Sequence, residues 1–551
     1  MQAARGQESA AIIGFRTGTF RPQAAEYKQL IGCLIDIKAN KLASTIAQTV
    51  YRENPRSFDN VYCAALTELY CKRPDTAIKI ASDGITAMGP NANMYLVVGL
   101  AMMSVDSLQN AGSAFQAALQ ITAKPIAIAY LGEVFRLMGK TDEAAACHAK
   151  CFQNGCIDAE AYFLAGIAFY DAGQVDKAID HYLTAIDKKP YYIDAHDTLN
   201  KTLWEHGRHA EFLKSFDVAT KMLPDLIALP LRHAYFRILA GKLYDAVQQL
   251  ENCLETFGPN ARVYAELASV KKQLDEDFDV LPLYTQSYEL DATDVNMLKA
   301  YGRGLIGKQQ YKQAAEILTE CKAIDGADQE CLAFLAAANT HINPKQARRV
   351  NDYDELVQVF DISPPQGHSD IAAFNTALLR ALQPHHRTEA APIDQTLVRG
   401  TQTHGMLFNK AGGEINQLET QLRGCIAQYV QHLQQVGPSE IKDRISDSFD
   451  FSGAWSVQLN EGGYHRDHVH SAGWISSVYY VEVPSGLDDD AHEGWLKFGD
   501  MHFDPKNTGP HRFVKPVQGR LVLFPSYMLH GTVPIQKGKR RTTVAFDVVP
   551  H

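Results

Sequence analysis

Apolar and polar positions follow a helical pattern over residues 25–340 of this chain. Small residues recur within the pattern at steps of 34 residues or multiples of 34: Ala144, Ala178, Ala246, Ala314, Gly139, Gly173, Gly207 and Gly241. One pair of helices cannot bury its apolar face alone, so pairs that repeat with a fixed period stack and share a continuous core. The pattern predicts eight or nine stacked helix pairs in this part of the chain.

One repeat unit, residues 161–190, contains the residue types that such stacking needs. Alanine and glycine permit a close approach of two helices, large residues such as Tyr162 and Tyr182 fill the gaps, and Pro190 ends the second helix. The unit resembles the tetratricopeptide repeat, whose period is about 34 residues. The match is weaker in the outer repeats, where Asp275 stands at a position for which the period predicts glycine.

The resemblance implies an all-α superhelix, which we assign to residues 25–345, after an N-terminal extension at residues 1–24. Arrays of this kind present a concave surface that binds extended peptides or partner proteins. We therefore expect a protein or peptide partner on the concave face. Packing against the rest of the chain, or self-association, is the alternative.

The helical pattern gives way to short alternating segments after residue 345, in a domain that we assign to residues 346–551. Prolines and a glycine within residues 361–369 mark the change. Helices are expected at 370–382 and 413–435, with an extended segment at 395–408. Short strands are expected at 453–459, 474–483, 494–498, 511–514, 520–524 and 542–548. Evenly spaced short strands predict a β-sandwich or barrel, so the chain is expected to be a multidomain α + β protein.

Composition narrows the class of protein. A hydrophobic content of 46% and a charged content of 21% are typical of a soluble globular chain. The formal charge of −10, without a block of Lys and Arg, argues against a nucleic-acid partner. No apolar stretch approaches the length of about 18 residues that a membrane span needs, so no membrane association is expected. The ten cysteines are scattered and form no CxxC pair, so a cytoplasmic location is expected.

Residues 465–470 concentrate the candidate chemistry of the chain. A strand projects residues i and i+2 to the same side, so His468 and His470 could offer two metal ligands from one element, and so could His465 and Asp467. The two pairs have opposite parity, and a regular strand can point only one of them at a metal. His530, a few residues after Leu523-Phe-Pro-Ser526, is the candidate third ligand.

A basic residue completes the pattern. Arg541 follows His530 by eleven residues on the last predicted strand, and Thr543 faces the same side as Arg541. A guanidinium group binds a carboxylate through two hydrogen bonds, and a threonine hydroxyl can add a third. This arrangement fits a site that holds a metal ion together with a carboxylate-bearing cosubstrate.

Three segments together resemble the Fe(II)/2-oxoglutarate-dependent oxygenases of the double-stranded β-helix fold: 468–484 (His-Val-His-Ser-Ala-Gly-Trp-Ile-Ser-Ser-Val-Tyr-Tyr-Val-Glu-Val-Pro), 523–530, and 541–547 (Arg-Thr-Thr-Val-Ala-Phe-Asp). The closest branch is related to prolyl hydroxylases and reads H-x-H-P followed by S-G-V-Y-Y. Ser471 and Ser477 depart from that pattern but are not ligand positions. The resemblance covers roughly residues 350–551 and implies a jelly-roll or cupin-like domain with flanking helices.

The resemblance also implies the cofactors and their residues. Fe(II) is expected on His468, His470 and His530, with O2 as a cosubstrate. The second cosubstrate, 2-oxoglutarate, is expected on Arg541, Thr543, Tyr480 and Ser476. The spacing to the later residues favours the pair His468 and His470, while His465 with Asp467 remains the other candidate.

The implied activity is hydroxylation of a C–H bond, in a peptide or other substrate recruited by the repeat array. An all-imidazole site contains no protein anion and offers no vacant position for a halide, so we favour hydroxylation over halogenation. The alternatives are a non-catalytic scaffold whose β-helix domain serves only for docking, and a cupin-like metalloenzyme that does not use 2-oxoglutarate.

Overall fold

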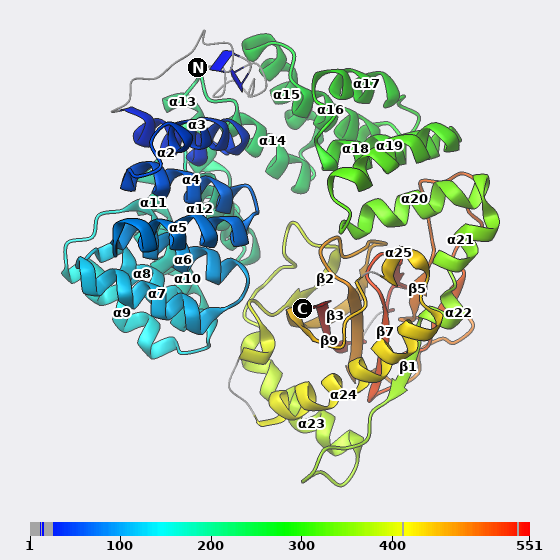
Figure 1. Ribbon diagram of the computed structural model, residues 1–551. Helices are drawn as coiled ribbons and strands as arrows, with labels where there is room; N and C mark the ends of the chain where they lie inside the picture. Colours follow the sequence, from blue (N-terminus) through cyan, green and yellow to red (C-terminus); the bar gives the residue numbers. More distant parts are fainter. Residues whose placement is uncertain are drawn as a thin grey trace. The chain divides into compact units, whose positions relative to one another are not determined.

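The computed structural model describes residues 11–12, 14–15, 26–409, 413–442, 444–536 and 539–550 (Figure 1). The chain divides into two compact units, residues 1–203 with 208–260, and residues 204–207 with 261–551. The predicted multidomain α + β organisation is confirmed, with helical repeats followed by a domain of antiparallel sheets. The N-terminal extension predicted at residues 1–24 lies almost entirely outside the described residues. No helix within the described ranges is long and apolar enough to cross a membrane.

The first unit consists of successive helix pairs. They are α2 (Tyr27–Asp36), α3 (Asn40–Glu53), α4 (Phe58–Tyr70), α5 (Pro74–Met88), α6 (Ala92–Ser104), α7 (Leu108–Ile121), α8 (Pro125–Leu137), α9 (Thr141–Gln153), α10 (Ala159–Asp171), α11 (Val175–Lys188), α12 (Ile193–Glu205), α13 (Lys214–Met222), α14 (Ala228–Leu239) and α15 (Leu243–Phe257). Two more pairs follow in the second unit, α16 (Ala261–Leu274) with α17 (Leu281–Leu290) and α18 (Val295–Gly307) with α19 (Tyr311–Ile324). Among the described residues, helices α2 to α19 therefore form nine pairs, within the predicted number.

The turn inside a pair explains why the sequence period fades in the outer repeats. Glycines with φ between 66° and 76° occupy this turn in four consecutive repeats: Gly139, Gly173, Gly207 and Gly241. Lys72, Asp106 and Gln309 adopt the same left-handed conformation in other repeats, with φ of 59°, 57° and 58°. A left-handed residue other than glycine costs about 1–2 kcal/mol, so the backbone keeps a turn that the glycine pattern no longer marks. Asp275 instead follows the end of α16, in a longer connection.

Close packing within three of the pairs depends on a glycine opposite a large side chain. A Cβ atom added to Gly166 would lie 2.5 Å from the Tyr182 ring. The same relationship, at a separation of sixteen residues, joins two further pairs of residues: Gly99 with Phe115, and Gly302 with Leu318. In these three pairs, a glycine on the first helix makes room for a large side chain on the second.

The second unit joins the last repeats to the sheet domain. Helices α16 to α19 are followed by α20 (Gln329–Ile342), α21 (Pro344–Val350) and α22 (Tyr353–Leu356). A single hydrophobic core includes residues of these helices and of the sheets, from Ala268 to Val548. The domain boundary predicted at residue 345 therefore lies within a continuous core, and its position stays a prediction.

The sheet domain contains two antiparallel sheets. A six-stranded sheet has the order β1-β7-β4-β9-β3-β2, and a three-stranded sheet has the order β6-β5-β8. Phe498 of the small sheet meets Phe524 of the large sheet edge-on, with ring centroids 5.0 Å apart. The strands are β1 (Gln358–Asp361), β2 (Leu397–Gln402), β3 (Phe449–His465), β4 (Ile475–Glu482), β5 (Leu496–Phe498), β6 (Arg512–Val514), β7 (Arg520–Pro525), β8 (His530–Thr532) and β9 (Arg541–Pro550).

All six predicted strands are present, and β2 lies inside the predicted extended segment. The sequence pattern missed β1 and β8, of four and three residues, which pair with the distant strands β7 and β5. The predicted helices correspond to α23 (Ile371–Leu382) and α24 (Gly413–Val436).

Both of these helices pack on the large sheet. Helix α24 buries one face, at Ile415, Leu418, Leu422, Ile426, Tyr429, Val430 and Leu433. Helix α23 is connected to β4 by a hydrogen bond of 2.7 Å from the Tyr479 hydroxyl to Asn375 Oδ1.

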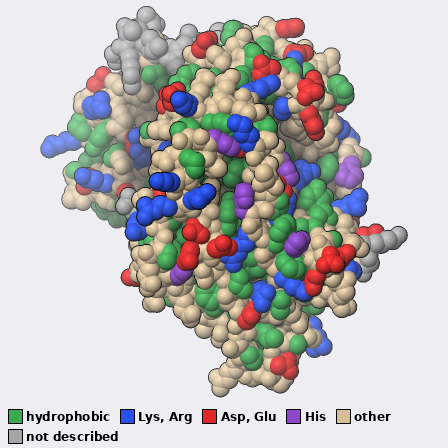
Figure 2. All heavy atoms as spheres, turned by 90° about the vertical axis from the view of Figure 1, so that its right-hand side faces the viewer, with side chains coloured by type: hydrophobic (Ala, Val, Ile, Leu, Met, Phe, Trp, Pro, Cys, Tyr) green, Lys and Arg blue, Asp and Glu red, His purple; other side chains and the backbone are tan. Residues whose placement is uncertain are grey.

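Figure 2 shows one face of the molecular surface. On this face, basic and acidic side chains are interspersed with hydrophobic ones.

Candidate functional site

Three histidines converge between the two sheets. His468 and His530 form an isolated antiparallel bridge, with backbone N–H···O distances of 2.9 and 3.0 Å. The Nε2 atoms of His468 and His470 are 3.1 Å apart. The ring centroid of His530 lies 4.3 Å from that of His468 and 5.2 Å from that of His470. One ligand atom from each of the three lies within 4.8 Å of the others, so a single metal ion could contact all three rings.

Each ring is held by its Nδ1 atom. The Nδ1 atom of His468 lies 2.7 Å from the carbonyl oxygen of Arg466, and that of His530 lies 2.9 Å from the carbonyl oxygen of Met528. An Nδ1–H that donates to such an acceptor leaves the lone pair on Nε2 for a metal. Burial lowers the pKa of His468 to about 3 and lowers the pKa of His530 well below its ordinary value, so both rings are neutral at pH 7.

The third ring is held by a carboxylate. The Nδ1 atom of His470 lies 2.7 and 2.6 Å from the two carboxylate oxygens of Asp547. Asp547 also accepts a hydrogen bond of 2.7 Å from the hydroxyl of Ser476. The sequence reasoning did not single out Asp547, although it shares the strand parity of Arg541 and Thr543.

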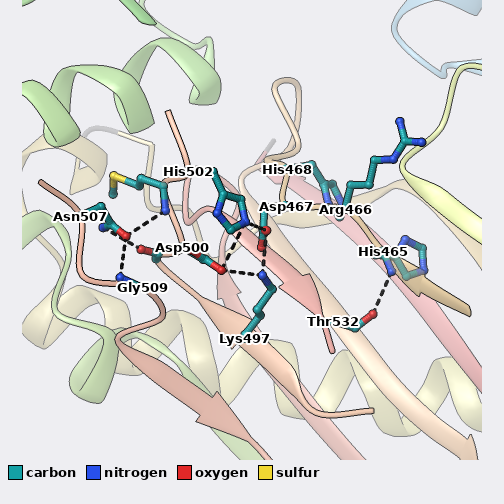
Figure 3. A network of polar contacts seen from close by, with 12 residues as sticks. His465, Arg466, Asp467, His468, Lys497, Asp500, His502, Asn507, Gly509 and Thr532 are labelled. Atoms are coloured by element: carbon teal, nitrogen blue, oxygen red, sulfur yellow. Dashed lines mark hydrogen bonds and ion pairs between the residues drawn. The ribbon is translucent and has the colours of Figure 1, made fainter. Parts of the chain in front are cut away.

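Asp467 belongs to a different cluster. Its carboxylate pairs with the ammonium of Lys497 at 2.8 Å and lies 3.0 Å from Nε2 of His502 (Figure 3). Lys497 also contacts Asp500 at 2.6 Å. Asp467, Asp500 and His502 are close enough to share an ion. The Lys497 ammonium already supplies the positive charge between the two carboxylates, so a metal is not needed there.

His465 lies near the three converging rings without joining them, with its ring centroid 5.9 Å from that of His468. It is the last residue of β3, and its backbone N–H donates to the Thr532 hydroxyl at 2.8 Å (Figure 3). Its Nδ1 atom lies 3.3 Å from the hydroxyl of Thr396. The structure thus groups His468 and His470 with His530, and it separates the pair His465 and Asp467 into two other environments.

A cavity of about 630 Å³ opens onto the three rings. Strand β9 lines it with alternate residues: Arg541, Thr543, Ala545 and Asp547. Trp455, Val457 and Tyr480 are among the other side chains that line it. The cavity therefore brings the converging imidazoles and the basic residue into one space.

Arg541 is the buried cation of this cavity, with only 2% of its surface exposed. Its Nη1 donates to the carbonyl oxygen of Gly494 at 2.5 Å. Its Nε atom and the hydroxyl of Tyr480 have no hydrogen-bond partner among the described residues. Burial lowers the pKa of Arg541 and raises the pKa of Tyr480. A buried guanidinium with an unpaired Nε–H, beside an unpaired hydroxyl, fits an anionic ligand such as a carboxylate.

Thr543 and Ser476, the other predicted cosubstrate residues, differ in position. Thr543 lines the cavity. Ser476 is fully buried, and its hydroxyl contacts Asp547 at 2.7 Å and the Ser526 hydroxyl at 2.8 Å. Ser476 therefore reaches the cavity only through Asp547.

The sequence of the sheet domain matches a known family. Residues 453–547 match the family described as "Putative 2OG-Fe(II) oxygenase". No curated protein matches the chain.

Several solved structures are similar to parts of the chain. A thermophilic TPR protein of Thermus thermophilus is 18% identical, with 33% of this chain and 98% of that chain covered and a TM-score of 0.30. The APC/C hetero-tetramer Cut9-Hcn1 is 13% identical, with 56% and 54% covered and a TM-score of 0.31. A Pseudomonas putida prolyl-4-hydroxylase is 17% identical, with 37% and 97% covered and a TM-score of 0.25. None of these likenesses is close enough to transfer an activity.

The repeat period, the sheet domain and the family match lead to one description. The chain is a fusion of a tetratricopeptide-like helical array with a C-terminal domain that matches the 2OG-Fe(II) oxygenase family.

Proposed function

We propose that this protein is an Fe(II)- and 2-oxoglutarate-dependent dioxygenase that hydroxylates a C–H bond. The observation that carries the proposal is one cavity that contains three converging imidazoles and a buried guanidinium whose Nε–H is unpaired and which pairs with no carboxylate among the described residues. A structural core has no need for either feature, because a buried cation without an anionic partner is costly.

His468, His470 and His530 are the proposed metal ligands, each through Nε2. Imidazole nitrogen suits Fe(II), and three ligands on one side of an ion leave the remaining positions of an octahedron open. Fixed Nδ1 contacts keep all three rings oriented before the ion binds. The neutral state of His468 and His530 means that the ion does not have to displace protons from these two rings at pH 7.

Arg541 is the proposed partner of the far carboxylate of 2-oxoglutarate. Its Nε–H and the Tyr480 hydroxyl are unpaired among the described residues, and Thr543 lines the same cavity two residues along β9. These groups would satisfy a carboxylate that reaches the buried end of the cavity. Ser476 is proposed to act on the site through Asp547 rather than by touching the cosubstrate.

Bound Fe(II) and 2-oxoglutarate would supply the activation of O2, with the cosubstrate converted into succinate and CO2. The chain orients both groups and surrounds them with buried side chains such as Tyr480 and Phe524.

The substrate is proposed to be a peptide or protein that the repeat array recruits, since stacked helical repeats bind extended partners. Conversion of 2-oxoglutarate can be measured without this substrate, so the chemistry and the recruitment can be tested separately.

The experiment is succinate formation by the full chain with Fe(II), 2-oxoglutarate and O2, in the presence and absence of a peptide library. His530→Ala should abolish turnover, and Arg541→Ala should reduce it strongly at low 2-oxoglutarate concentration. His502→Ala is the matched control, because this histidine is 70% exposed and outside the three converging rings, and it should behave as wild type. Absence of succinate from the wild-type protein in every reaction would favour a non-catalytic scaffold.

A further inference from the structure

The three converging histidines differ in what holds them. His468 and His530 face backbone carbonyl oxygens, at 2.7 and 2.9 Å. His470 alone faces a carboxylate, with both oxygens of Asp547 within 2.7 Å of its Nδ1 atom. A carbonyl oxygen is neutral, whereas a carboxylate carries a full negative charge. The set of three imidazoles is therefore electrostatically asymmetric.

Asp547 is itself held in place from neighbouring strands. Ser476 lies opposite it in the register of β4 and β9 and donates to Oδ1 at 2.7 Å. The Ser526 hydroxyl lies 2.8 Å from that of Ser476. Gly473 leaves room for this chain of contacts, because an added Cβ atom would lie 2.4 Å from Ser526 Oγ. Within the described part of the chain, no lysine or arginine pairs with Asp547.

We propose that Asp547 is a positioning residue that fixes His470 and adds a negative charge to an otherwise neutral set of metal ligands. The inference rests on the metal centre of the proposed function. Nδ1 and Nε2 lie on opposite sides of the imidazole ring, so Asp547 does not compete for the ion. A carboxylate at Nδ1 makes Nε2 a stronger donor. Iron sites with two histidine ligands have a carboxylate as the third direct ligand. Here the carboxylate of Asp547 acts indirectly, through His470.

Asp547→Asn separates charge from geometry. Asparagine keeps an oxygen that can accept from His470 and removes the negative charge. If Asp547 only orients the ring, metal affinity should stay at the wild-type value. If the charge matters, affinity should fall about 10- to 100-fold, the usual effect of losing such a partner of a metal ligand. The visible spectrum of bound Co(II) should also shift, because the donor strength of one ligand changes.

The measurement is a Co(II) titration of the metal-free full-length protein, followed by visible absorption and with folding verified by circular dichroism. Asp504→Asn is the matched control. Asp504 is another buried carboxylate that contacts a histidine, His341 at 2.8 Å, and it lies outside the cavity. This variant should bind Co(II) as the wild type does.

Equal affinity and an equal spectrum for Asp547→Asn and wild type would overturn the inference and leave the proposed oxygenase intact. A wild-type protein that binds no Co(II) would remove the metal centre and this inference with it. If Asp547→Asn does not fold, Ser476→Ala tests the positioning role. It keeps the charge but removes the hydroxyl that holds the carboxylate, so weaker Co(II) binding supports the positioning of His470 by Asp547 and unchanged binding contradicts it.

Discussion

The guanidinium carbon of Arg541 lies 5.6 Å from the centroid of the Tyr480 ring, inside the cavity of the sheet domain. Each residue contributes a polar atom that has no partner among the described residues. The two residues come from neighbouring strands, with Tyr480 on β4 and Arg541 on β9. This pair defines the end of the cavity that is suited to a carboxylate.

Arg541→Met should raise the KM for 2-oxoglutarate by at least about tenfold. Loss of a hydrogen bond to a charged group costs about 1.5–3 kcal/mol, and about 1.4 kcal/mol corresponds to a factor of ten. The check is succinate formation over a range of 2-oxoglutarate concentrations. Arg540→Met is the control, because Arg540 is the adjacent arginine but is partly exposed and pairs with Glu482 at 3.1 Å. Equal KM values for both variants would contradict the assignment.

Gly166→Ala should destabilise the repeat array by about 1–3 kcal/mol, the usual cost of overpacking. The new Cβ atom would lie 2.5 Å from the Tyr182 ring, which is fully buried. Denaturant unfolding measures the effect. Gly424→Ala makes the same change on the exposed side of α24, where no atom lies within 4 Å of the new Cβ. That control should be neutral or slightly stabilising, and two effects of the same sign and size would refute the packing argument.

Stability should fall on acidification between pH 6.5 and 4. Burial lowers the pKa of His148 from 6.5 to about 4, and neither ring nitrogen has a partner among the described residues. In this pH window the unfolded chain binds a proton that the folded chain does not, so the free energy of unfolding decreases as pH falls. His148→Leu should flatten this dependence by up to about 1.4 kcal/mol per pH unit. Identical pH profiles for the variant and wild type would rule out this contribution.

Asp504 should anchor the loop between β5 and β6 to the last repeat helices. Its carboxylate accepts a hydrogen bond of 2.9 Å from the Tyr311 hydroxyl and lies 2.8 Å from Nε2 of His341. Asp504→Ala should cost about 1–3 kcal/mol, because it leaves buried polar groups unpaired. It should also accelerate amide exchange over residues 499–511. Asp354→Ala, at a 96% exposed side chain, should change neither quantity.

The fold could be predicted because its main signals are local. The period of small residues predicted the helix pairs, and the pattern of short apolar segments predicted six strands, including the three-residue β5 and β6. The turn at Lys72 shows the limit of this reasoning, because its left-handed backbone is held by the repeat and not by a glycine. Strands β1 and β8 gain their conformation from pairing with distant strands, β7 and β5 respectively.

The site shows the same limit. Strand parity could not choose between the two candidate ligand pairs, and the assumption of one regular strand does not hold. Strand β3 ends at His465, and His468 is held by an isolated bridge to His530. The contact between His470 and Asp547 joins positions 77 residues apart, so only the folded chain reveals it.

Ser476 illustrates why parity alone does not assign a role. It shares the parity of Tyr480 on β4, but its hydroxyl is covered by Asp547 and Ser526. Whether a side chain reaches the cavity therefore also depends on the side chains of the adjacent strands, which the sequence pattern does not reveal.

The most direct test of the account is an anaerobic titration of the full-length protein with Fe(II) and then 2-oxoglutarate, followed by visible absorption. The account predicts one Fe(II) per chain and a charge-transfer band that forms when 2-oxoglutarate is added. His530→Ala should lose both Fe(II) binding and the charge-transfer band. Arg541→Met should still bind Fe(II) but should lose the band at the same 2-oxoglutarate concentration. A wild-type protein that binds Fe(II) without developing the band, or that binds no Fe(II), would contradict the central claim.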